Sequence, residues 1–350
     1  MKTDSQALSQ QELHRYSRHL NLPDFGLEGQ KRLKASKILV IGAGGLGTPL
    51  LQYLTAAGVG SLGIVEFDHV EVTNLQRQVI YKTAQVGKAK ALLAAHWVKA
   101  LNSHVEVHLH EVRLTRKNAL RILANYDLIV DGTDNFPTRY LVNDACVLLG
   151  KPLIYASIYR FEGQVSVFNY RNSDGKLGPN YRDLFPTPPP PDLVPSCAEG
   201  GVLGVLPGII GSMQALEAIK VATGVGEPLS GRLMLFDALD FSMRTLRLAR
   251  DPDNPLNGDN PTITELIDYE EFCGINPDSK LSSSLVELPS LAVQELHRWR
   301  EEKKPHQLID VREPYEAAIV SLGGKLIPLE ELKERASEIS SNLPVVIHCR

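Results

Sequence analysis

A glycine-rich turn after a short apolar run is the first part of the chain that could do chemistry. Gly42, Gly44 and Gly47 match the pattern G-x-G-x-x-G, directly after the apolar residues 38–41. Because glycine lacks a Cβ atom, such a turn brings backbone N–H groups close to phosphate oxygens at the positive end of the next helix. Glu66 follows at about the spacing of a ribose-binding acid, roughly 20 residues on. The pattern predicts a nucleotide site, although an NAD site and a glycine turn without a ligand share this spacing.

Further polar residues follow the later strands and carry charges that a dinucleotide does not need. Asn74, Arg77 and Lys90 lie on connections after the second expected strand, and Asp134 and Asn135 follow the fourth. Ligands of an open parallel sheet bind at the carboxyl ends of its strands, so these side chains should meet beside the glycine turn. Arg77 or Lys90 alone would be an ordinary surface charge. Two cations and a carboxylate together suit a triphosphate with Mg²⁺.

Strands and helices alternate along the segment that must position these side chains. Apolar runs predict strands at about 38–41, 61–67, 105–112, 127–131, 152–156 and 162–170. Helices are expected at about 47–57, 86–99, 115–126, 138–149 and 205–223, before a closing hairpin at 232–248. This alternation predicts an α/β fold with a doubly wound, Rossmann-like, mostly parallel sheet.

A second pattern follows a segment rich in proline, asparagine, glycine and serine. We expect a first domain at 10–250, a linker at 251–284 and a second α/β domain at 285–350. The second domain should contain a helix at 291–301, a strand at 307–312, a helix at 329–337 and a strand at 344–350. The last strand delivers Cys349. A functional thiol there would need a further loop and helix, so we expect the second domain to be truncated.

Composition and charge exclude several classes of protein. The chain has 350 residues, of which 43% are hydrophobic, and a net charge of −4, so bulk nucleic-acid binding is not expected. Its polar start lacks an apolar signal core, and prolines, glycines and charged residues interrupt the apolar stretch 202–225. We therefore expect a cytoplasmic protein with no membrane span.

Five ordered motifs resemble the MoeB/ThiF family, the bacterial relatives of ubiquitin-activating enzymes. They are RYSR at 15–18, GAGGLG at 42–47, TNLQRQ at 73–78, GKAK at 87–90 and TDN at 133–135. The resemblance runs from about residue 10 to 250. The later stretches LIDVREP at 308–314 and HCR at 348–350 are similar to the first half of a rhodanese domain. Together they resemble the fused adenylyltransferase–sulfurtransferases of the MoeZ or MoeBR type.

The resemblance implies a reaction between two proteins and ATP. The C-terminal Gly-Gly carboxylate of a ubiquitin-like, MoaD- or ThiS-like sulfur carrier would attack the α-phosphate, giving an acyl-adenylate and pyrophosphate. Sulfur would then replace AMP to give a thiocarboxylate, with a cysteine desulfurase or thiosulfate as the sulfur donor. Such carriers serve molybdenum cofactor (molybdopterin), thiamin, cysteine and tRNA-thiolation pathways.

The resemblance also implies roles for residues at the motif positions. Gly45 would let the nucleotide approach the backbone, and Glu66, where relatives often have Asp, would bind the ribose. Asp134 would hold Mg²⁺ with Asn135 beside it, and Arg18 would reach the ATP of the opposite protomer, so a homodimer is implied. Phosphate and other nucleotide contacts are expected from the two central motifs: Thr73, Asn74, Leu75, Gln76, Arg77 and Lys90.

Two of the four cysteines are candidates for chemistry. Cys197 follows a proline-rich loop and precedes a glycine-rich helix start, where a thiolate is stabilised. A buried structural cysteine is the alternative, but relatives place a loop cysteine here that forms a transient acyl or disulfide link to the carrier. Cys349 is placed to carry a persulfide. Cys146, in an apolar helix, and Cys273, in the expected linker, are interpreted as structural or incidental.

One departure from the family concerns zinc. Zinc-bearing relatives have two C-x-x-C pairs, which align here with the stretches 180–183 (NYRD) and 254–257 (NPLN). No thiolate remains at these positions, and amides are poor zinc ligands. The sequence therefore predicts no structural zinc.

Two other functions compete with an adenylating enzyme. An NAD(P)-dependent oxidoreductase would explain the glycine motif but not Arg77, Lys90 and Asp134 together. A non-catalytic scaffold for a ubiquitin-like partner would not need a complete set of phosphate and metal ligands. Both alternatives remain open on the residues alone.

Overall fold

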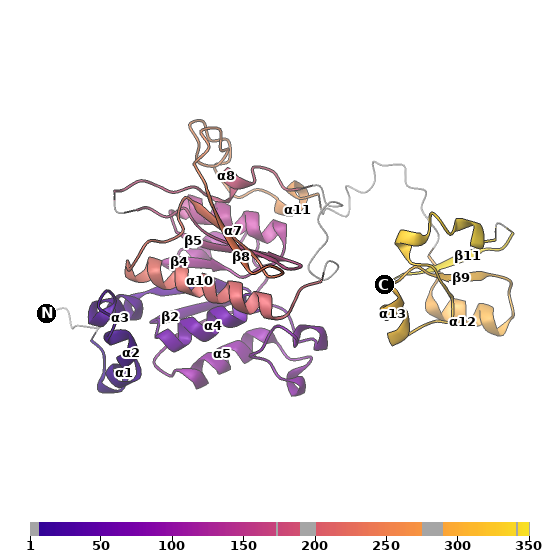
Figure 1. Ribbon diagram of the computed structural model, residues 1–350, viewed down its shortest axis with the longest axis horizontal. Coiled ribbons are helices and arrows are strands. Elements are labelled where there is room, and N and C mark those ends of the chain that lie inside the picture. The colour runs from indigo at the N-terminus through magenta and orange to yellow at the C-terminus, as the bar shows by residue number, and fades with distance from the viewer. Residues whose placement is uncertain (1–6, 173, 190–200, 275–289, 341, 350) are drawn as a thin grey trace. The chain divides into compact units, whose positions relative to one another are not determined.

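The computed structural model describes residues 7–172, 174–189, 201–274, 290–340 and 342–349 (Figure 1). The chain divides into two compact units, Met1–Lys280 and Leu281–Arg350. The first unit contains the glycine turn and the polar connections, and the second contains Cys349.

The first unit is built on an eight-stranded sheet in the order β3-β2-β1-β4-β5-β6-β7-β8. The strands are β1 Lys37–Ile41, β2 Ser61–Val65, β3 Glu106–His110, β4 Leu128–Asp131, β5 Leu153–Tyr159, β6 Glu162–Phe168, β7 Arg232–Asp237 and β8 Ser242–Arg247. The strands from β3 to β5 are parallel, and β6, β7 and β8 extend the sheet in antiparallel fashion. The predicted Rossmann-like α/β class is confirmed.

Helices cover both faces of the sheet because its central strands are apolar on both. In β1, Ile38 and Val40 belong to one hydrophobic cluster, and Leu39 and Ile41 belong to the other. The first cluster is closed by α3 Gly26–Ala35, α4 Gly47–Ala57, α5 Lys90–Leu101 and α10 Val205–Thr223. The second is closed by α6 Ala119–Leu123, α7 Phe136–Leu149, α8 Tyr181–Leu184 and α11 Tyr269–Phe272. Short helices α1 Gln10–Arg15 and α2 Ser17–Leu20 precede α3, and 3₁₀ turns lie at η1 Val72–Asn74 and η2 Thr83–Gln85.

Helix α10 is long and apolar enough to cross a membrane. In the structure it instead packs against α4, α3 and the strands β4, β5 and β6 (Figure 1). Its polar side chains are used inside the fold: Gln214 Nε2 donates to the Asp131 carbonyl at 2.8 Å, and Glu217 accepts from the Leu229 N–H at 2.8 Å. The helix therefore serves as a core element of the first unit.

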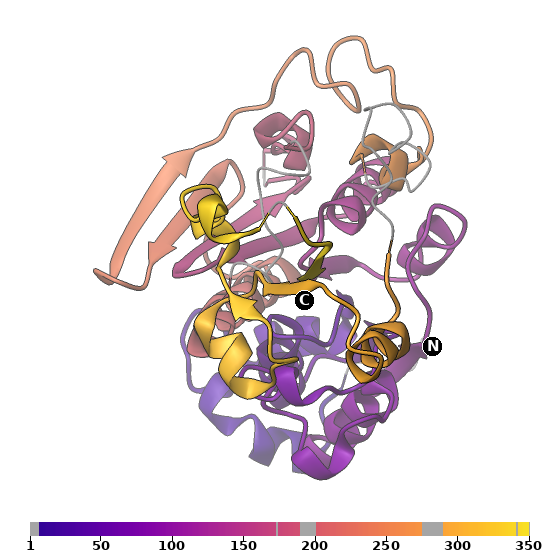
Figure 2. The same ribbon diagram turned by 90° about the vertical axis from the view of Figure 1, so that its right-hand side faces the viewer.

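The segment from Asp251 to Gly274, expected as part of a linker, packs onto the first unit. Figure 2 shows it arching from β8 across to α11. Leu256 and Tyr269 are each 5% exposed, and the Tyr269 hydroxyl donates to Asp144 of α7 at 2.8 Å. Long-range polar contacts of this kind leave no signature in local composition.

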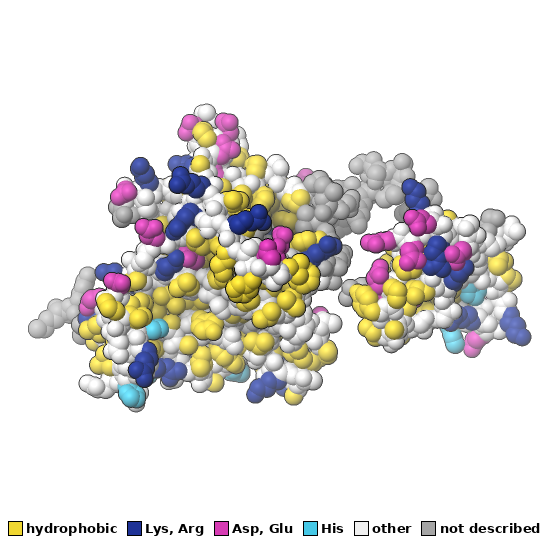
Figure 3. Space-filling model, viewed as in Figure 1, with side chains coloured by type: hydrophobic (Ala, Val, Ile, Leu, Met, Phe, Trp, Pro, Cys, Tyr) yellow, Lys and Arg dark blue, Asp and Glu magenta, His cyan; other side chains and the backbone are white. Residues whose placement is uncertain are grey.

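The turn between β7 and β8 carries exposed apolar side chains. Leu239 and Phe241 are 74% and 75% exposed, and Met243, in the adjoining β8, is 56% exposed. Figure 3 shows apolar side chains gathered over the region of β8 and α10. A contiguous apolar surface of this kind is typical of a protein-binding face.

The second unit has a three-stranded parallel sheet in the order β10-β9-β11. Its elements are α12 Val293–Glu301, β9 Gln307–Asp310, α13 Pro314–Ile319, β10 Lys325–Leu326, η4 Leu329–Glu331, η5 Ala336–Glu338 and β11 Val345–His348. Two short 3₁₀ turns replace the helix expected at 329–337. Ile309, Val311 and Ile327 form its small core. The Arg312 guanidinium binds both oxygens of Asp310, at 2.9 and 2.6 Å, and lowers the pKa of that carboxyl to about 2.

Candidate active site

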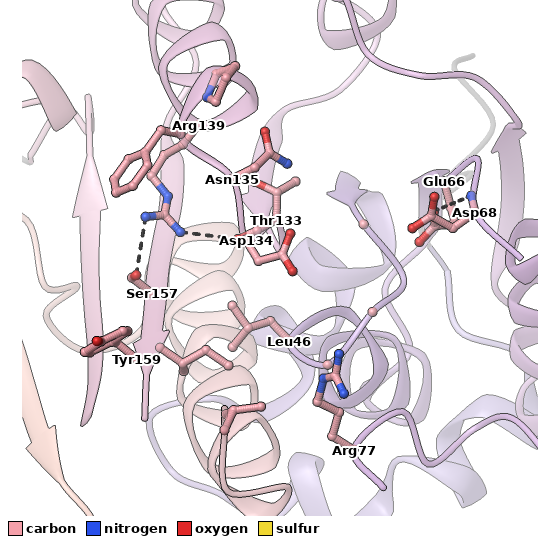
Figure 4. Close-up of a pocket in the computed structure, with 18 of the residues that line it drawn as sticks. Leu46, Glu66, Asp68, Arg77, Thr133, Asp134, Asn135, Arg139, Ser157 and Tyr159 are labelled. Atoms are coloured by element: carbon pink, nitrogen blue, oxygen red, sulfur yellow. Dashed lines mark hydrogen bonds between the residues drawn. The ribbon is translucent and has the colours of Figure 1, made fainter. Parts of the chain in front are cut away.

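A cavity of about 510 Å³ lies at the carboxyl ends of the central parallel strands (Figure 4). Segments far apart in the sequence line it: the glycine turn, the end of β2, the connection after η1, the start of α5 and the loop after β4. Most of the residues predicted from the motifs are among its lining: Gly42, Gly44, Gly45, Glu66, Asn74, Arg77, Lys90, Asp134 and Asn135. Thr73, Leu75 and Gln76 belong to the same connection but are not part of the lining.

The glycine turn is fixed by sterics and by two hydrogen bonds. Gly42 has φ 89°, and a Cβ atom on Gly47 would lie 2.0 Å from the Gly42 carbonyl oxygen. The Ala43 carbonyl accepts from the Tyr81 hydroxyl at 2.9 Å, and the Ala43 N–H donates to Glu66 at 2.8 Å. The turn is therefore rigid before any nucleotide binds.

Glu66 is more deeply engaged than the sequence indicates. It is 5% exposed, and besides the Ala43 N–H its carboxylate accepts the N–H groups of Phe67 and Asp68 at 2.8 and 2.9 Å. Asp68, two residues on, has an exposed carboxylate on the cavity wall and lies 3.6 Å from Lys90 Nζ. Sequence reasoning missed Asp68, although its place directly after a strand of the parallel sheet was the available signal.

The two predicted cations approach the cavity from different connections. Arg77 donates to the Thr73 carbonyl at 3.0 Å, and a Cβ atom on Gly45 would lie 3.4 Å from the Arg77 side chain. Lys90, the first residue of α5, is 5% exposed beside Asp68. Asn74 is buried and accepts from the Glu71 N–H at 3.3 Å. Two cations and the glycine turn thus line the same cavity, and the positive charge suits an anion.

The loop after β4 holds Asp134 and Asn135 at the cavity. Asn135 is the N-cap of α7, and its Oδ1 accepts from the Thr138 N–H at 3.0 Å. Figure 4 shows the Asp134 carboxylate facing the cavity. One carboxylate together with phosphate oxygens fits the octahedral preference of Mg²⁺. Among the residues that the structure describes, no group of three His, Cys, Asp or Glu side chains could hold a metal by itself.

Arg139 is a cavity residue that the sequence prediction did not include. It is 6% exposed and donates to Ser157 Oγ and to the Thr133 carbonyl, both at 3.3 Å (Figure 4). Its Nε lies 3.9 Å from Asp131 Oδ2, and neither buried atom has a hydrogen-bond partner. Burial raises the pKa of Asp131, against the opposing effect of Arg139. The signal was its position four residues after the N-cap of α7, which turns its side chain back to the cavity.

The sequence that forms this cavity is similar to that of known proteins. The ThiF family matches residues 16–256. The chain belongs to the ThiF family. A probable adenylyltransferase/sulfurtransferase MoeZ of Mycobacterium tuberculosis is 51% identical over 347 residues, which cover 98% of this chain and 86% of the relative. A sulfur carrier protein adenylyltransferase of Thermus thermophilus is 58% identical over 76% of this chain and 98% of its own length.

Further relatives extend this likeness. The adenylyltransferase and sulfurtransferase MOCS3 of Bos taurus is 48% identical over 95% of this chain and 73% of its own length. Among solved structures, Escherichia coli MccB with ATP has a TM-score of 0.58 and 21% identity, covering 70% of this chain and 73% of that chain. At that identity the structural likeness concerns the ThiF fold alone. Membership of the family removes the NAD(P)-dependent oxidoreductase from consideration.

The cysteines differ in their placement relative to the ThiF fold. Cys146 is buried in α7, and burial raises its pKa well above the ordinary value. Cys273, at the end of α11, is 5% exposed and lines the cavity, and burial raises its pKa to about 11. Cys349 is exposed after β11 in the second unit. Cys197 lies outside the described residues.

Arg18 is set apart from the cavity of its own ThiF domain. It lies in α2, is exposed, and is not among the residues that line the cavity. The cavity as the structure describes it is therefore lined without Arg18.

Proposed function

We infer that this protein is an ATP-dependent adenylyltransferase with sulfurtransferase activity. It adenylates the C-terminal glycine carboxylate of a ubiquitin-like sulfur carrier and then introduces sulfur to give a thiocarboxylate. The observation that carries this conclusion is the identity of 51% to MoeZ over 98% of the chain. The cavity beside the glycine turn, which is lined by the cations Arg77 and Lys90 and by the carboxylate of Asp134, is consistent with it.

The first step is an in-line displacement at the α-phosphate of ATP. A carboxylate oxygen of the carrier bonds to phosphorus while the bond to the β-phosphate oxygen breaks, and pyrophosphate leaves. Arg77 and Lys90 hold the phosphates and stabilise the charge that develops on them. Asp134 would hold a Mg²⁺ ion bound with ATP, and such an ion would supply positive charge beside the leaving pyrophosphate. Asp68 and Glu66, which both line the cavity, are proposed to recognise the ribose.

Arg139 is proposed to act on the carrier's carboxylate, which accepts the adenylyl group in this reaction. Its guanidinium reaches the Thr133 carbonyl, so it fixes the loop that carries Asp134. It also lies beside Ser157, away from Arg77, where the incoming carboxylate would enter (Figure 4). A buried positive charge there lowers the repulsion between the carboxylate and the triphosphate.

Replacing Arg139 tests this role. We expect Arg139→Gln to lower kcat/KM for the carrier about a hundredfold, because a buried charge and two hydrogen bonds are lost. Arg139→Lys should recover part of that loss, while the affinity for ATP stays within a few-fold of wild type. Initial rates with the carrier varied at saturating ATP measure the effect. An unchanged kcat/KM in a folded Arg139→Gln protein contradicts the assignment.

The second step transfers sulfur, and Cys349 and Cys197 are its proposed thiols. Cys349 takes sulfane sulfur from a donor such as a cysteine desulfurase or thiosulfate. The terminal sulfur of the persulfide bonds to the carrier's acyl carbon and AMP leaves, which gives an acyl disulfide with Cys349. A thiolate then attacks the Cys349 sulfur, so that the S–S bond breaks, the carrier thiocarboxylate leaves, and the new disulfide is reduced by a further thiol. Cys197 forms the transient acyl or disulfide link to the carrier during this exchange. The product is distinguished from the starting carrier by mass spectrometry, because one oxygen is replaced by sulfur; a carrier that gains no sulfur contradicts the proposed function.

The working form is proposed to be a cytoplasmic homodimer. Arg18 is exposed and does not line the cavity of its own chain, which supports a role across a dimer interface. The exposed apolar side chains of the turn between β7 and β8 support a docking face for a protein partner. Molybdenum cofactor synthesis is one of several pathways that such a carrier could serve.

Mixing two inactive variants tests the shared site. Arg18→Ala and Lys90→Ala should each be nearly inactive alone, because each removes a phosphate contact. After subunit exchange, a mixed dimer has one site with both changes and one with neither, so activity should return to about a quarter of wild type. ATP consumption in the mixture measures this return. A mixture that stays as inactive as its components contradicts the trans role of Arg18.

A further inference from the structure

Four polar side chains join α8 to the segment after β8 through hydrogen bonds, although the buried Asn257 Nδ2 has no partner among the described residues. Asn180 and Asp183 belong to the start of α8, and Asn254 and Asn257 belong to the returning segment. Asn180 Nδ2 donates to Asn257 Oδ1 at 2.9 Å, and Asn254 Nδ2 donates to Asp183 Oδ1 at 2.6 Å. These two bonds join positions 77 and 71 residues apart, so they fasten the segment to α8.

The same side chains also satisfy backbone groups on both sides of the junction. Asp183 accepts the N–H groups of Asp251 at 2.9 Å and of Asn180 at 2.6 Å. Asn254 Oδ1 accepts from the Leu256 N–H at 2.9 Å. Asn180 and Asn254 are 0% and 1% exposed, so these bonds replace contacts with water that the fold has removed. We name Asn180, Asp183, Asn254 and Asn257 the amide clasp.

A buried ion pair next to the amide clasp joins α8 to α7 in the first unit. Arg182, inside α8, donates from Nε and NH2 to the two oxygens of Asp144 in α7, both at 2.8 Å. The Tyr269 hydroxyl also donates to Asp144. Bidentate pairing of this kind fixes orientation as well as distance. The junction is thereby held rigidly against α7 and α11.

The donor set of the amide clasp does not fit a structural zinc ion. Its four positions align with the two C-x-x-C pairs of zinc-bearing relatives, but zinc prefers thiolate and imidazole ligands in tetrahedral sites. Here two of the four side chains present N–H donors to their neighbours, and the Asp183 oxygens already accept three N–H groups. Zinc binding would require these hydrogen bonds to break.

We propose that the hydrogen bonds of the amide clasp take the place of the zinc ion that the two C-x-x-C pairs bind in relatives. The junction between α8 and the segment after β8 then needs no metal. The amide clasp also sets the wall of the cavity, because α8 leads directly into Phe185–Pro189, and Pro188 and Pro189 line the cavity. The clasp is therefore a positioning element for the active site as well as a closure for the segment 251–258.

Metal content of the full chain tests the proposal directly. Protein produced in zinc-supplemented medium should contain well below one zinc per chain by elemental analysis, and a chelator should leave its melting temperature unchanged. A content near one zinc per chain, or a lower melting temperature in the chelator, overturns the proposal.

A variant with four cysteines tests whether the four positions have the geometry of a zinc site. The fourfold change Asn180→Cys, Asp183→Cys, Asn254→Cys and Asn257→Cys should take up one zinc per chain, and a chelator should then lower its melting temperature. A folded fourfold variant that binds no zinc overturns the proposal that the amide clasp occupies the position of the zinc site of relatives.

A charge exchange tests the hydrogen bond between Asn254 and Asp183. Asn254→Asp removes the donor and places two carboxylates in contact, so its melting temperature should fall by about 5 to 10 °C. Adding Asp183→Asn restores a donor–acceptor pair and should recover about half of that fall. The exposed Asn260 provides the matched control, and Asn260→Asp should change the melting temperature by about 1 °C at most.

KM values show whether the amide clasp positions the cavity wall in addition to stabilising the first unit. At a temperature where Asn254→Asp stays folded, its KM for the carrier or ATP should rise severalfold, because the wall at Pro188 and Pro189 is displaced. Asn260→Asp should keep the wild-type KM. Equal melting temperatures and equal KM values for the two variants overturn the proposal. Loss of adenylation in wild type would instead contradict the proposed function, so the two failures are distinguishable.

Discussion

Replacing Asp134 with asparagine should lower kcat for adenylation about a thousandfold, because the cavity loses the carboxylate proposed to hold Mg²⁺. Asparagine keeps the shape of the side chain, and Asn135 still caps α7 through Thr138, so the loop should stay folded. The loss is expected in the chemical step. The concentration of Mg²⁺ needed for half-maximal rate should also rise.

The matched control for this change is Asp68→Asn. Asp68 is a second exposed carboxylate in the same cavity, 3.6 Å from Lys90. If only the general negative charge of the cavity matters, both variants should behave alike. We expect Asp68→Asn to raise the KM for ATP by about tenfold or less, with kcat nearly unchanged. Steady-state rates over a range of Mg²⁺ and ATP concentrations measure both effects. A rate for Asp134→Asn within a few-fold of wild type contradicts the role of Asp134.

Cys349→Ala should abolish thiocarboxylate formation while leaving adenylation of the carrier intact. The thiol lies in the second unit, whereas every residue proposed for adenylation belongs to the first or to its partner protomer. Cys349 is exposed and follows His348, whose Nδ1 lies 3.5 Å from Asp310. Arg312 holds that carboxylate in place beside His348.

Cys146→Ala is the matched control for the second prediction. Cys146 is buried in α7, where burial raises its pKa, and it has no access to substrate. This variant should keep both adenylation and sulfur transfer, with only a modest loss of stability. Mass spectrometry of the carrier and pyrophosphate release measure the two steps separately. Thiocarboxylate formed at the wild-type rate by Cys349→Ala would show that another group delivers the sulfur.

Local patterns predicted the core of the fold well because their causes are local. The run from Ile38 to Ile41 is apolar on both faces, and β1 is covered on both faces. Gly42 and Gly47 stand where the backbone needs a positive φ or where a Cβ atom would clash. Motif spacing also predicted which connections meet at the cavity, since parallel strands end at one edge.

Features that depend on distant contacts escaped the sequence. The carboxylate of Glu66 is occupied by three backbone N–H groups, and only the folded turn brings Ala43 to it. The segment expected as a linker packs onto α7 and α8, because Asn254 and Tyr269 find partners that are 71 and 125 residues away in the sequence. Arg139 reads as an ordinary helix residue until the fold buries it beside Asp131.

Carrier-dependent exchange of pyrophosphate into ATP tests the central claim most directly. Small proteins ending in Gly-Gly, captured from the native cell by the full chain, would supply the candidate carriers. We expect labelled pyrophosphate to enter ATP only when a carrier with an intact C-terminal glycine is present, and to fail to do so with Lys90→Ala. Absence of exchange with every captured carrier, or exchange that is independent of any carrier, contradicts the account.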